Sequence, residues 1–383
     1  MKRIYLDHAA TTPMDKRVLK AMMPYFSDKY GNPMSLHSFG REALRGIEAS
    51  REKIAKFFNC EKQEIYFTSG ATESNNWAIK GVVKASKEKN PHIITSSIEH
   101  HCVLEACKDV SAEITYIKPD KNGIVSFKDV KKAIKKNTVL ISIMYVNNEI
   151  GTVQPIKEIS KIKGKALFHT DATQAVNYFD CDVKNLGVDL LSMSGHKIYG
   201  PKGVGLLYIK NNSRITSIQQ GGSQEGDLRA GTHNVPGIVG LGKAIELIKK
   251  NNKNILNLRN YLISKILKEI KGSKINGSLE YRSPNNANFT FDNVEGESLL
   301  FLLDEEGIAV STGSACSSGS LKPSHVLTAI GLSHKEAHGS LRITIGKETT
   351  KKEIDVAISK IKNSVEKLRK LSGDVLKEYE QLQ

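Results

Sequence analysis

The chain has 383 residues, of which 39% are hydrophobic, enough for a large buried core and, we expect, two domains. No stretch approaches the ~20 apolar residues of a membrane-spanning helix, and the first residues lack the apolar core and cleavage site of a signal peptide. Five cysteines scattered along the chain do not indicate a disulfide framework, so we expect a protein of the reducing cytoplasm.

The net charge of +15 raises the question of nucleic-acid binding. Only 11 of the 56 basic residues are arginine, so the excess is lysine, and clusters such as KKAIKK lie on helical patterns typical of solvated faces. No signature interleaves aromatic with basic residues as nucleic-acid-binding modules do. The charge favours weak, salt-sensitive attraction to polyanions over specific recognition.

Helical and strand patterns alternate from about residue 40 onward. The patterns predict helices over 42–58, 71–88 and 100–109, and strands over 64–70, 92–97, 138–146, 166–172, 188–194 and 203–209. This alternation predicts an α/β fold with a mostly parallel sheet covered by helices on both faces.

A second region follows a long helical segment over 238–270. Residues 287–293 and 341–346 read as strands, and a lysine-rich helical tail closes the chain. We expect a large domain over 14–258 and a smaller α+β domain made of 1–13 and 259–383.

Polar stretches stand where the predicted strands end: TSGATES, SIEHH, NNEIG, DATQ and SGHK. In open α/β sheets, ligands bind beyond the carboxyl ends of the strands. These stretches are therefore expected to converge on one crevice.

One lysine in this set has an unusual setting. Lys197 lies in LLSMSGHKIYGPKG, after an apolar run and among small residues and turn formers. A lysine amine that must lose its proton and bind a carbonyl needs a rigid, partly dry site of this kind. A surface turn that happens to carry a lysine explains the fragment equally well.

Three other positions have both a functional and an ordinary reading. SGATES opens a helix whose free N–H groups at Ala71 and Thr72 suit a phosphate, although Ser and Thr are also common helix caps. Asp171 follows an apolar strand and needs a cation, for which a protonated pyridine nitrogen would serve, unless it only caps a helix. Gln174 is placed to bond a ring oxygen or to complete a capping box.

His100 lies at a strand-to-helix junction, where an imidazole can stack on a planar ring and carry protons, or simply be solvated. Asn148 is placed to bond a ring hydroxyl or to shape a turn. Cys316, in the small-residue run STGSACSSGSLKP, suits an exposed nucleophile. Cys102 and Cys107 lie near histidines, but their spacing matches no usual zinc signature, so we expect no metal.

Taken in order, the motifs YLDHAATTP, GNPMSLH, FTSGATESNN, EHHCVL, VNNEIG, DATQ, SGHKIYGPKG, RAGTHN, GSACSSG and AHGSLR closely resemble one family. This family is the pyridoxal-phosphate-dependent cysteine desulfurases of the NifS/IscS type, and the resemblance covers nearly the whole chain. It implies pyridoxal-phosphate fold type I, with a mostly parallel seven-stranded sheet flanked by helices in the large domain and a smaller α+β domain.

The resemblance also implies a role for each matching residue. Lys197 resembles the lysine to which pyridoxal phosphate is covalently attached, and Cys316 the catalytic nucleophile. His100 would stack on the cofactor ring and carry protons. The other implied cofactor ligands are Ala71, Thr72, Asn148, Asp171, Gln174, Ser194, His196 and, from the partner subunit of a homodimer, the residue matching Thr232. Substrate binding is implied for Arg342, Asn148 and Asn32, with His37 near the same mouth.

The implied reaction converts L-cysteine to L-alanine and leaves the sulfur as a persulfide on Cys316. Lys197, with a pKa lowered by its surroundings, would remove the α-proton. The long run between Cys316 and the next helix resembles the branch with a longer catalytic loop, so we expect delivery of sulfur to an iron–sulfur scaffold protein or a tRNA-thiolating enzyme.

Two other classes stay open. A selenocysteine lyase or a small-substrate aminotransferase of the same fold would share Lys197 and Asp171, but an aminotransferase would not need Cys316. A non-enzymatic nucleic-acid-binding or scaffold protein would explain the charge of +15, and would hold no cofactor.

Overall fold

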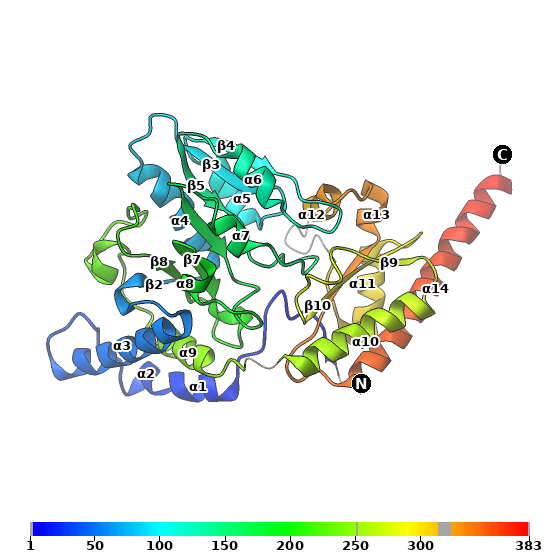
Figure 1. Cartoon of the computed structure of the whole chain (residues 1–383). Helices are drawn as coiled ribbons and strands as arrows, with labels where there is room; N and C mark the ends of the chain where they lie inside the picture. The colour runs from blue at the N-terminus through cyan, green and yellow to red at the C-terminus, as the bar shows by residue number, and fades with distance from the viewer. Residues whose placement is uncertain (1–2, 250–251, 313–322, 382–383) are drawn as a thin grey trace.

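The computed structural model describes residues 3–249, 252–312 and 323–381, with side chains up to residue 371. Its centre is a seven-stranded sheet in the order β2-β8-β7-β6-β5-β3-β4 (Figure 1). The strands are β2 (Ile65–Thr68), β3 (His92–Ser96), β4 (Glu113–Ile117), β5 (Thr138–Ser142), β6 (Leu167–Asp171), β7 (Leu190–Ser194) and β8 (Gly205–Ile209). In this sheet β8 runs opposite to the other six strands, so the prediction of a mostly parallel sheet is confirmed.

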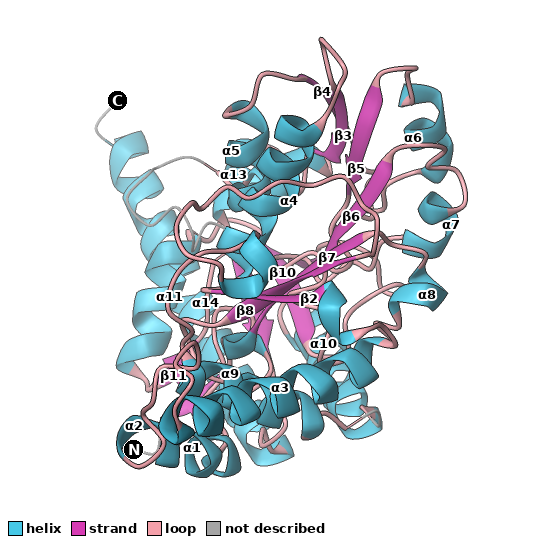
Figure 2. Cartoon of the chain, turned by 90° about the vertical axis from the view of Figure 1, so that its left-hand side faces the viewer, coloured by secondary structure: helices cyan, strands magenta, loops and turns pink. Residues whose placement is uncertain are grey.

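Helices cover both faces of this sheet because its central strands are apolar on both sides. In β7, Leu191 packs into one hydrophobic core with α3 (Ser38–Phe58) and α9 (Val235–Glu246). Its neighbour Leu190 points the other way, into a core with α4 (Ala71–Ala85) and α5 (His101–Lys108). Figure 2 shows the strands running between these layers.

Five shorter helices add to the core that contains Leu191. They are α1 (Lys16–Met22), α2 (Pro24–Ser27), α6 (Phe127–Ala133), α7 (Ile156–Ser160) and α8 (Val183–Leu186). No helix within the described ranges is long and apolar enough to cross a membrane.

The second region has its own core, on the right in Figure 1. Helices α10 (Lys253–Glu269), α11 (Gly296–Glu305) and α14 (Lys351–Gln381) pack around a sheet of β12 (Ser340–Thr344), β10 (Asn286–Phe291) and β9 (Ser273–Ile275). Strand β1 (Ile4–Tyr5) pairs with β11 (Ile308–Ala309), so the start of the chain joins this core. Helices α12 (His325–Ala329) and α13 (His334–His338) follow.

The expected helix over 238–270 is instead two helices, α9 and α10. The side chains of α9 pack into the core of the large sheet, whereas Ile255 and Leu262 of α10 pack into the second core. One straight helix cannot face both cores, and the asparagines around Asn252 are weaker helix formers than leucine. We therefore propose to place the domain boundary between α9 and α10, slightly before the expected residue 258.

Candidate active site

A cavity of about 560 Å³ lies where the carboxyl ends of the parallel strands meet. Segments after β2, β3 and β5, the ends of β6 and β7, and the N-terminal residues 9–11 line it. The structure brings together in this cavity most of the residues singled out in the sequence: Ala71, Thr72, His100, Asn148, Asp171, Gln174, Ser194, His196, Lys197 and Arg342.

Lys197 is positioned by a tight turn directly after β7. The N–H of Gly200 donates to the carbonyl of Gly195 at 3.0 Å, and a Cβ on Gly200 would lie 2.8 Å from that same oxygen. Glycine is therefore required there, which explains the small neighbours of the lysine. The Lys197 amine donates to the carbonyls of Ala9 and Ala10, the latter at 2.7 Å.

The start of helix α4 forms one wall of the cavity. Its N-cap is Gly70, with φ 155° and ψ 179°, a conformation open essentially only to glycine. No side chain of the described residues caps this helix. The first-turn residues Ala71 and Thr72 line the cavity, so their end of the helix is suited to an anion.

Ser194 and His196 line the same cavity as this helix end. Ser194 Oγ would be 3.6 Å from a Cβ on Gly70, so the two segments nearly touch. The His196 ring bonds Thr11 through Nδ1 at 3.1 Å. Burial and the charges of Lys197 and Lys202 lower the pKa of His196 to about 4, so the ring is a neutral hydrogen-bonding group at pH 7.

Asp171, at the end of β6, carries a buried carboxylate, and its negative charge needs a partner. Oδ2 accepts from Asn75 Nδ2 at 2.7 Å, and Oδ1 accepts from the N–H of Thr173 at 2.9 Å. No ion pair to Asp171 is found within the part of the chain that the structure describes. A buried carboxylate is most stable beside a cation, and a protonated pyridine nitrogen in the cavity meets that need.

His100 caps helix α5, and its Nδ1 accepts from the N–H of Cys102 at 3.2 Å. Because Nδ1 is an acceptor, the neutral ring carries its proton on Nε2. Burial lowers the pKa of His100, against the attraction of Asp171. Burial also raises the pKa of the Cys102 thiol to about 12, which keeps it protonated and unreactive.

Arg342, on β12, has a partly satisfied guanidinium. Nη2 pairs with Asp7 Oδ1 at 2.9 Å, and Nη1 donates to the carbonyl of Asn148 at 3.1 Å. The buried Nε has no hydrogen-bond partner among the described residues. These bonds use two of the five guanidinium N–H donors, and Arg342 lines the cavity, so donors remain for an incoming carboxylate.

Gln174 lines the cavity, and its Nε2 donates to the carbonyl of Ala9 at 3.0 Å, which leaves the side-chain oxygen and the second N–H for other partners. Asn32 and Thr232 are both exposed and lie outside the cavity lining. Asn32 Oδ1 accepts from the N–H of Met34 at 3.0 Å, and His37 caps α3. Cys316 lies outside the described residues.

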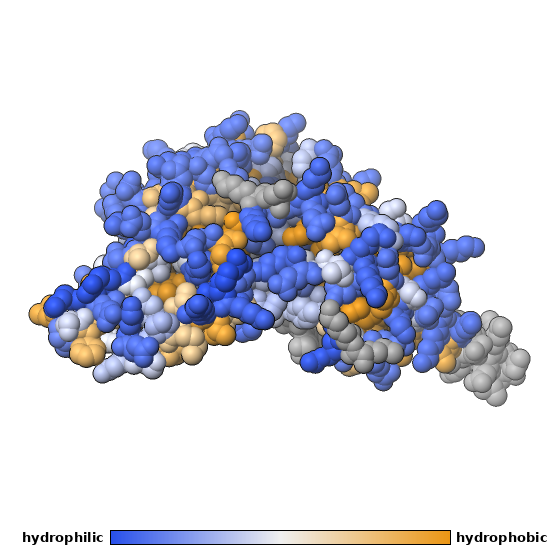
Figure 3. Space-filling view, turned by 90° about the horizontal axis from the view of Figure 1, so that it is seen from below, coloured by the Kyte–Doolittle hydropathy of each residue, from blue (hydrophilic) through white to orange (hydrophobic). Residues whose placement is uncertain are grey.

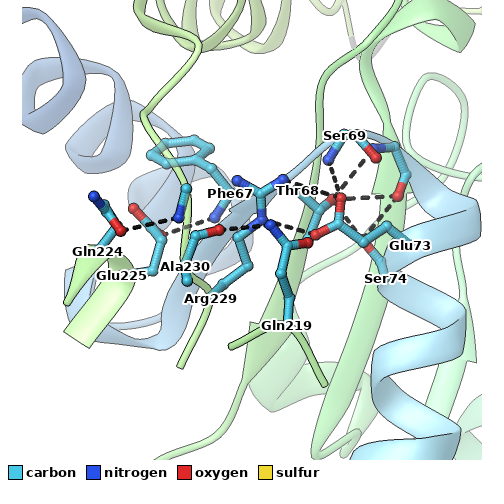
Figure 4. A network of polar contacts seen from close by, with 12 residues as sticks. Phe67, Thr68, Ser69, Glu73, Ser74, Gln219, Gln224, Glu225, Arg229 and Ala230 are labelled. Atoms are coloured by element: carbon cyan, nitrogen blue, oxygen red, sulfur yellow. Dashed lines mark hydrogen bonds and ion pairs between the residues drawn. The ribbon is translucent and has the colours of Figure 1, made fainter. Parts of the chain in front are cut away.

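Two partly buried ion pairs hold the segment that carries Thr232, one to the start of α4 (Figure 4) and one to α3. Arg229 Nε donates to Glu73 Oε1 at 2.8 Å, and Glu73 Oε2 accepts from the N–H of Ser69. Glu225 binds Arg51 at 2.8 Å.

Sequence reasoning missed several contributors. The carbonyls of Ala9 and Ala10, which hold Lys197, belong to the motif YLDHAATTP, but a backbone acceptor leaves no signal in residue type. Asp7, the partner of Arg342, and Asn75, one turn into α4, also lie in quoted motifs, YLDHAATTP and FTSGATESNN, but residue type alone did not single them out. No group of three side chains able to hold a metal ion occurs in the described ranges.

Comparison with known proteins agrees with this geometry. The family described as aminotransferase class-V matches residues 4–356. A protein of Dictyoglomus turgidum named cysteine desulfurase IscS is 53% identical over 382 residues, covering 97% of each chain. A solved NifS-like protein superposes with a TM-score of 0.88 at 39% identity, covering 94% of this chain and 98% of its own.

A second solved structure, described as SspA in complex with cysteine, superposes with a TM-score of 0.81 at 42% identity, covering 89% of this chain and 98% of its own. These matches extend over nearly the full length of the chain, and the family expected from the motifs is confirmed. The chain belongs to the aminotransferase class-V family and, within it, to the cysteine desulfurases of the IscS type.

Proposed function

We propose that the protein is a pyridoxal-phosphate-dependent cysteine desulfurase that converts L-cysteine to L-alanine and takes up the sulfur as a persulfide on Cys316. The observation that carries the proposal is the juxtaposition of three groups in one cavity. An uncapped helix start suits a phosphate, the Lys197 amine suits an aldehyde, and the Asp171 carboxylate, which has no cation among the described residues, suits a pyridine nitrogen. A volume of about 560 Å³ is ordinary for a small-molecule site.

Pyridoxal phosphate, when bound, supplies an electron sink that makes the Cα proton of its amino acid removable. Ala71, Thr72, Ser194 and His196 would hold the phosphate, with the N–H groups of α4 as main donors. Asp171 keeps the proton on the ring nitrogen, and Asn75 fixes the direction of that carboxylate. His100 lines the same cavity and is assigned to stack on the ring.

Substrate binding and proton movement fall to other residues. The Arg342 guanidinium and the Asn148 side chain, which both line the cavity, bind the carboxylate of L-cysteine. Lys197 Nζ accepts the proton from Cα, for which the nearby carbonyls of Ala9 and Ala10 keep the amine in the cavity. His100 carries protons near the substrate sulfur through Nε2.

Sulfur transfer is assigned to Cys316. Its thiolate attacks the substrate sulfur, an S–S bond forms, the Cβ–S bond breaks, and the electron pair of that bond stays with the carbon fragment. That fragment takes up a proton and leaves as alanine, so one L-cysteine and one Cys316 thiol give one alanine and one persulfide. Two equivalents of an external thiol then release sulfide and are oxidised to a disulfide.

A second copy of the chain is proposed to complete the cavity. Helices α1–α3 and the residues between them expose several large apolar side chains, among them Leu36, which is 90% exposed. The others are Leu19, Met23, Phe26, Tyr30, Met34 and Phe39. Figure 3 shows apolar patches among polar residues on the underside of the molecule. Several large exposed apolar side chains within one stretch of chain are typical of subunit contacts. Asn32 lies in this segment, so it and Thr232 are assigned to the partner's cavity rather than to their own.

The acceptor of the persulfide sulfur is proposed to be an iron–sulfur scaffold protein or a tRNA-thiolating enzyme. The reaction itself is tested by giving L-cysteine, pyridoxal phosphate and dithiothreitol to the native protein and to Cys316→Ala. We expect equal amounts of alanine and sulfide from the native protein and almost no sulfide from the variant. Native protein that holds the cofactor but forms no sulfide would refute the proposal and favour an aminotransferase.

A further inference from the structure

The described residues on either side of the Cys316 segment are hydrogen-bonded to Arg342 and to Glu149. Arg342 and the neighbour of Glu149, Asn148, are the proposed ligands of the substrate carboxylate. Before the segment, Ser311 pairs with Arg342: the Ser311 N–H donates to the Arg342 carbonyl at 3.1 Å, and the Arg342 N–H to the Ser311 carbonyl at 2.7 Å. After it, the Ser324 hydroxyl donates to Glu149 Oε2. The first attachment is therefore on a proposed carboxylate ligand, Arg342, and the second is on the sequence neighbour of another, Asn148.

The Ser324–Glu149 contact is buried and has a defined direction. Ser324 is 5% exposed and Glu149 6%. Ser324 also caps helix α12, because its Oγ accepts from the N–H of Leu327 at 3.2 Å. The single hydroxyl hydrogen is donated to the Glu149 carboxylate. Burial raises the pKa of Glu149 to about 7, and the Ser324 hydrogen bond and the charge of Arg342 favour its ionised form.

The backbone of Glu149 is fixed independently of this contact. Its N–H donates to Asn147 Oδ1 at 2.9 Å, and its carbonyl accepts from the side chains of Asn286 and Asn288, each at 3.2 Å. One peptide earlier, the Asn148 carbonyl accepts from Arg342. The Glu149 carboxylate is therefore a rigid support, and Ser324 is the part that it holds in place.

We propose that Glu149 and Ser324 are positioning residues that fix the C-terminal end of the Cys316 segment beside the substrate carboxylate, and so govern the rate at which the Cys316 thiolate meets the substrate sulfur. This inference rests on the proposed function. A tethered nucleophile reacts faster when its attachment restricts it to the neighbourhood of its target. Neither residue is expected to act on the earlier step, which Arg342 and Lys197 perform.

The test uses holoenzyme loaded with pyridoxal phosphate and compares two readouts. The first is the change in cofactor absorbance on adding L-cysteine, which reports substrate binding and proton removal and needs no Cys316. The second is the single-turnover rate of persulfide formation on Cys316, followed by mass spectrometry. Ser324→Ala and Glu149→Met remove the donor and the acceptor. Each is expected to lower the second readout about tenfold, the size of one hydrogen bond to a charged group, and to leave the first within about twofold.

Three further variants separate positioning from general damage. Glu149→Gln keeps an acceptor and is expected to retain most of the persulfide rate. The double variant Ser324→Ala/Glu149→Met is expected to be no slower than either single variant, because both remove the same contact. Ser333→Ala removes a serine cap from α13, where Glu336 N–H donates to Ser333 Oγ at 3.3 Å, and is expected to lower the melting temperature without slowing persulfide formation.

Persulfide formation at the native rate in Ser324→Ala, or equal losses in both readouts for Ser324→Ala and Glu149→Met, would overturn the inference. Failure of the proposed function is distinguishable, because the native holoenzyme would then form neither alanine nor persulfide.

Discussion

Glu225 binds the segment that carries Thr232 to the rest of the large domain, and its substitution tests how much this contact stabilises the fold. Its side chain is 1% exposed and is surrounded by donors. Arg51 reaches its two oxygens at 2.8 and 3.1 Å, His233 Nε2 lies at 2.7 Å, and the N–H of Phe67 at 2.9 Å. Glu225 also has φ 49° and ψ 41°, a left-handed conformation that these contacts must keep in place. We predict that Glu225→Gln strongly destabilises the fold.

The expected loss of unfolding free energy can be derived from the pKa of Glu225. Although burial opposes it, hydrogen bonds from His233 and Arg51 lower the pKa of Glu225 from 4.5 to about 2. At about 1.4 kcal/mol for each unit of pKa, the ionised form contributes roughly 3 kcal/mol to the free energy of unfolding at pH 7. Removing one partner of a buried ion pair lowers the free energy of unfolding by about 3–5 kcal/mol, which agrees with the value derived from the pKa.

The sign of the pH dependence is fixed by the same shift. Because the folded-state pKa lies below the unfolded value, this stability is fully present above pH 4.5 and is lost as the pH falls toward 2. The gap in unfolding free energy between native protein and Glu225→Gln, measured by urea denaturation, should therefore narrow below pH 4.5, by roughly 1 kcal/mol near pH 4.

Glu105→Gln is the matched control. Glu105 pairs with Lys108 on the surface, where the two side chains are 62% and 61% exposed, so its loss should cost at most about 0.5 kcal/mol. A loss below about 1 kcal/mol for Glu225→Gln, or a gap that stays constant from pH 7 to pH 4, would refute the reasoning.

Three other outcomes are expected. Asn75→Ala loses the 2.7 Å bond to Asp171 and should weaken pyridoxal-phosphate binding about tenfold in equilibrium dialysis, whereas unchanged affinity would show that Asp171 orients itself. Arg342→Lys lacks the planar fork and should raise KM for L-cysteine about tenfold with a smaller effect on kcat; an unchanged KM would remove Arg342 from the carboxylate site. Leu36→Asp should shift sedimentation toward a monomer, while Leu279→Asp, at a site 57% exposed elsewhere, should not; identical sedimentation of both would contradict the proposed contact.

The sequence was most informative where strands end. Apolar runs such as Leu190–Ser194 have the length and the boundaries of buried strands. Because ligands bind at the carboxyl ends of such strands, the sequence predicts that Lys197, Asp171 and Asn148 line one site, as they do in the structure. Residue type also indicated chemistry at these positions, because a lysine among glycines and an aspartate after an apolar strand both require explanation.

Other parts were not predictable because their roles depend on tertiary contacts. The chain breaks between α9 and α10 because α9 packs into one hydrophobic core and α10 into another. The residues on either side of the break are all tolerated in helices, so the sequence does not predict the break. Asn75 is important for the direction it gives Asp171, and Glu225 for the two segments it joins. Long-range partners of this kind are set by the fold and leave no local pattern.

The most direct measurement of the central claim is a single turnover without reductant. Native holoenzyme is given one equivalent of L-cysteine, and alanine release is quantified together with the masses of the cysteine-containing peptides. The account predicts one alanine for each active site and one added sulfur atom on the peptide of Cys316, with none on the peptide of Cys102, whose thiol also lines the cavity. Alanine release with the sulfur on Cys102, or with no sulfur on any cysteine, would contradict it.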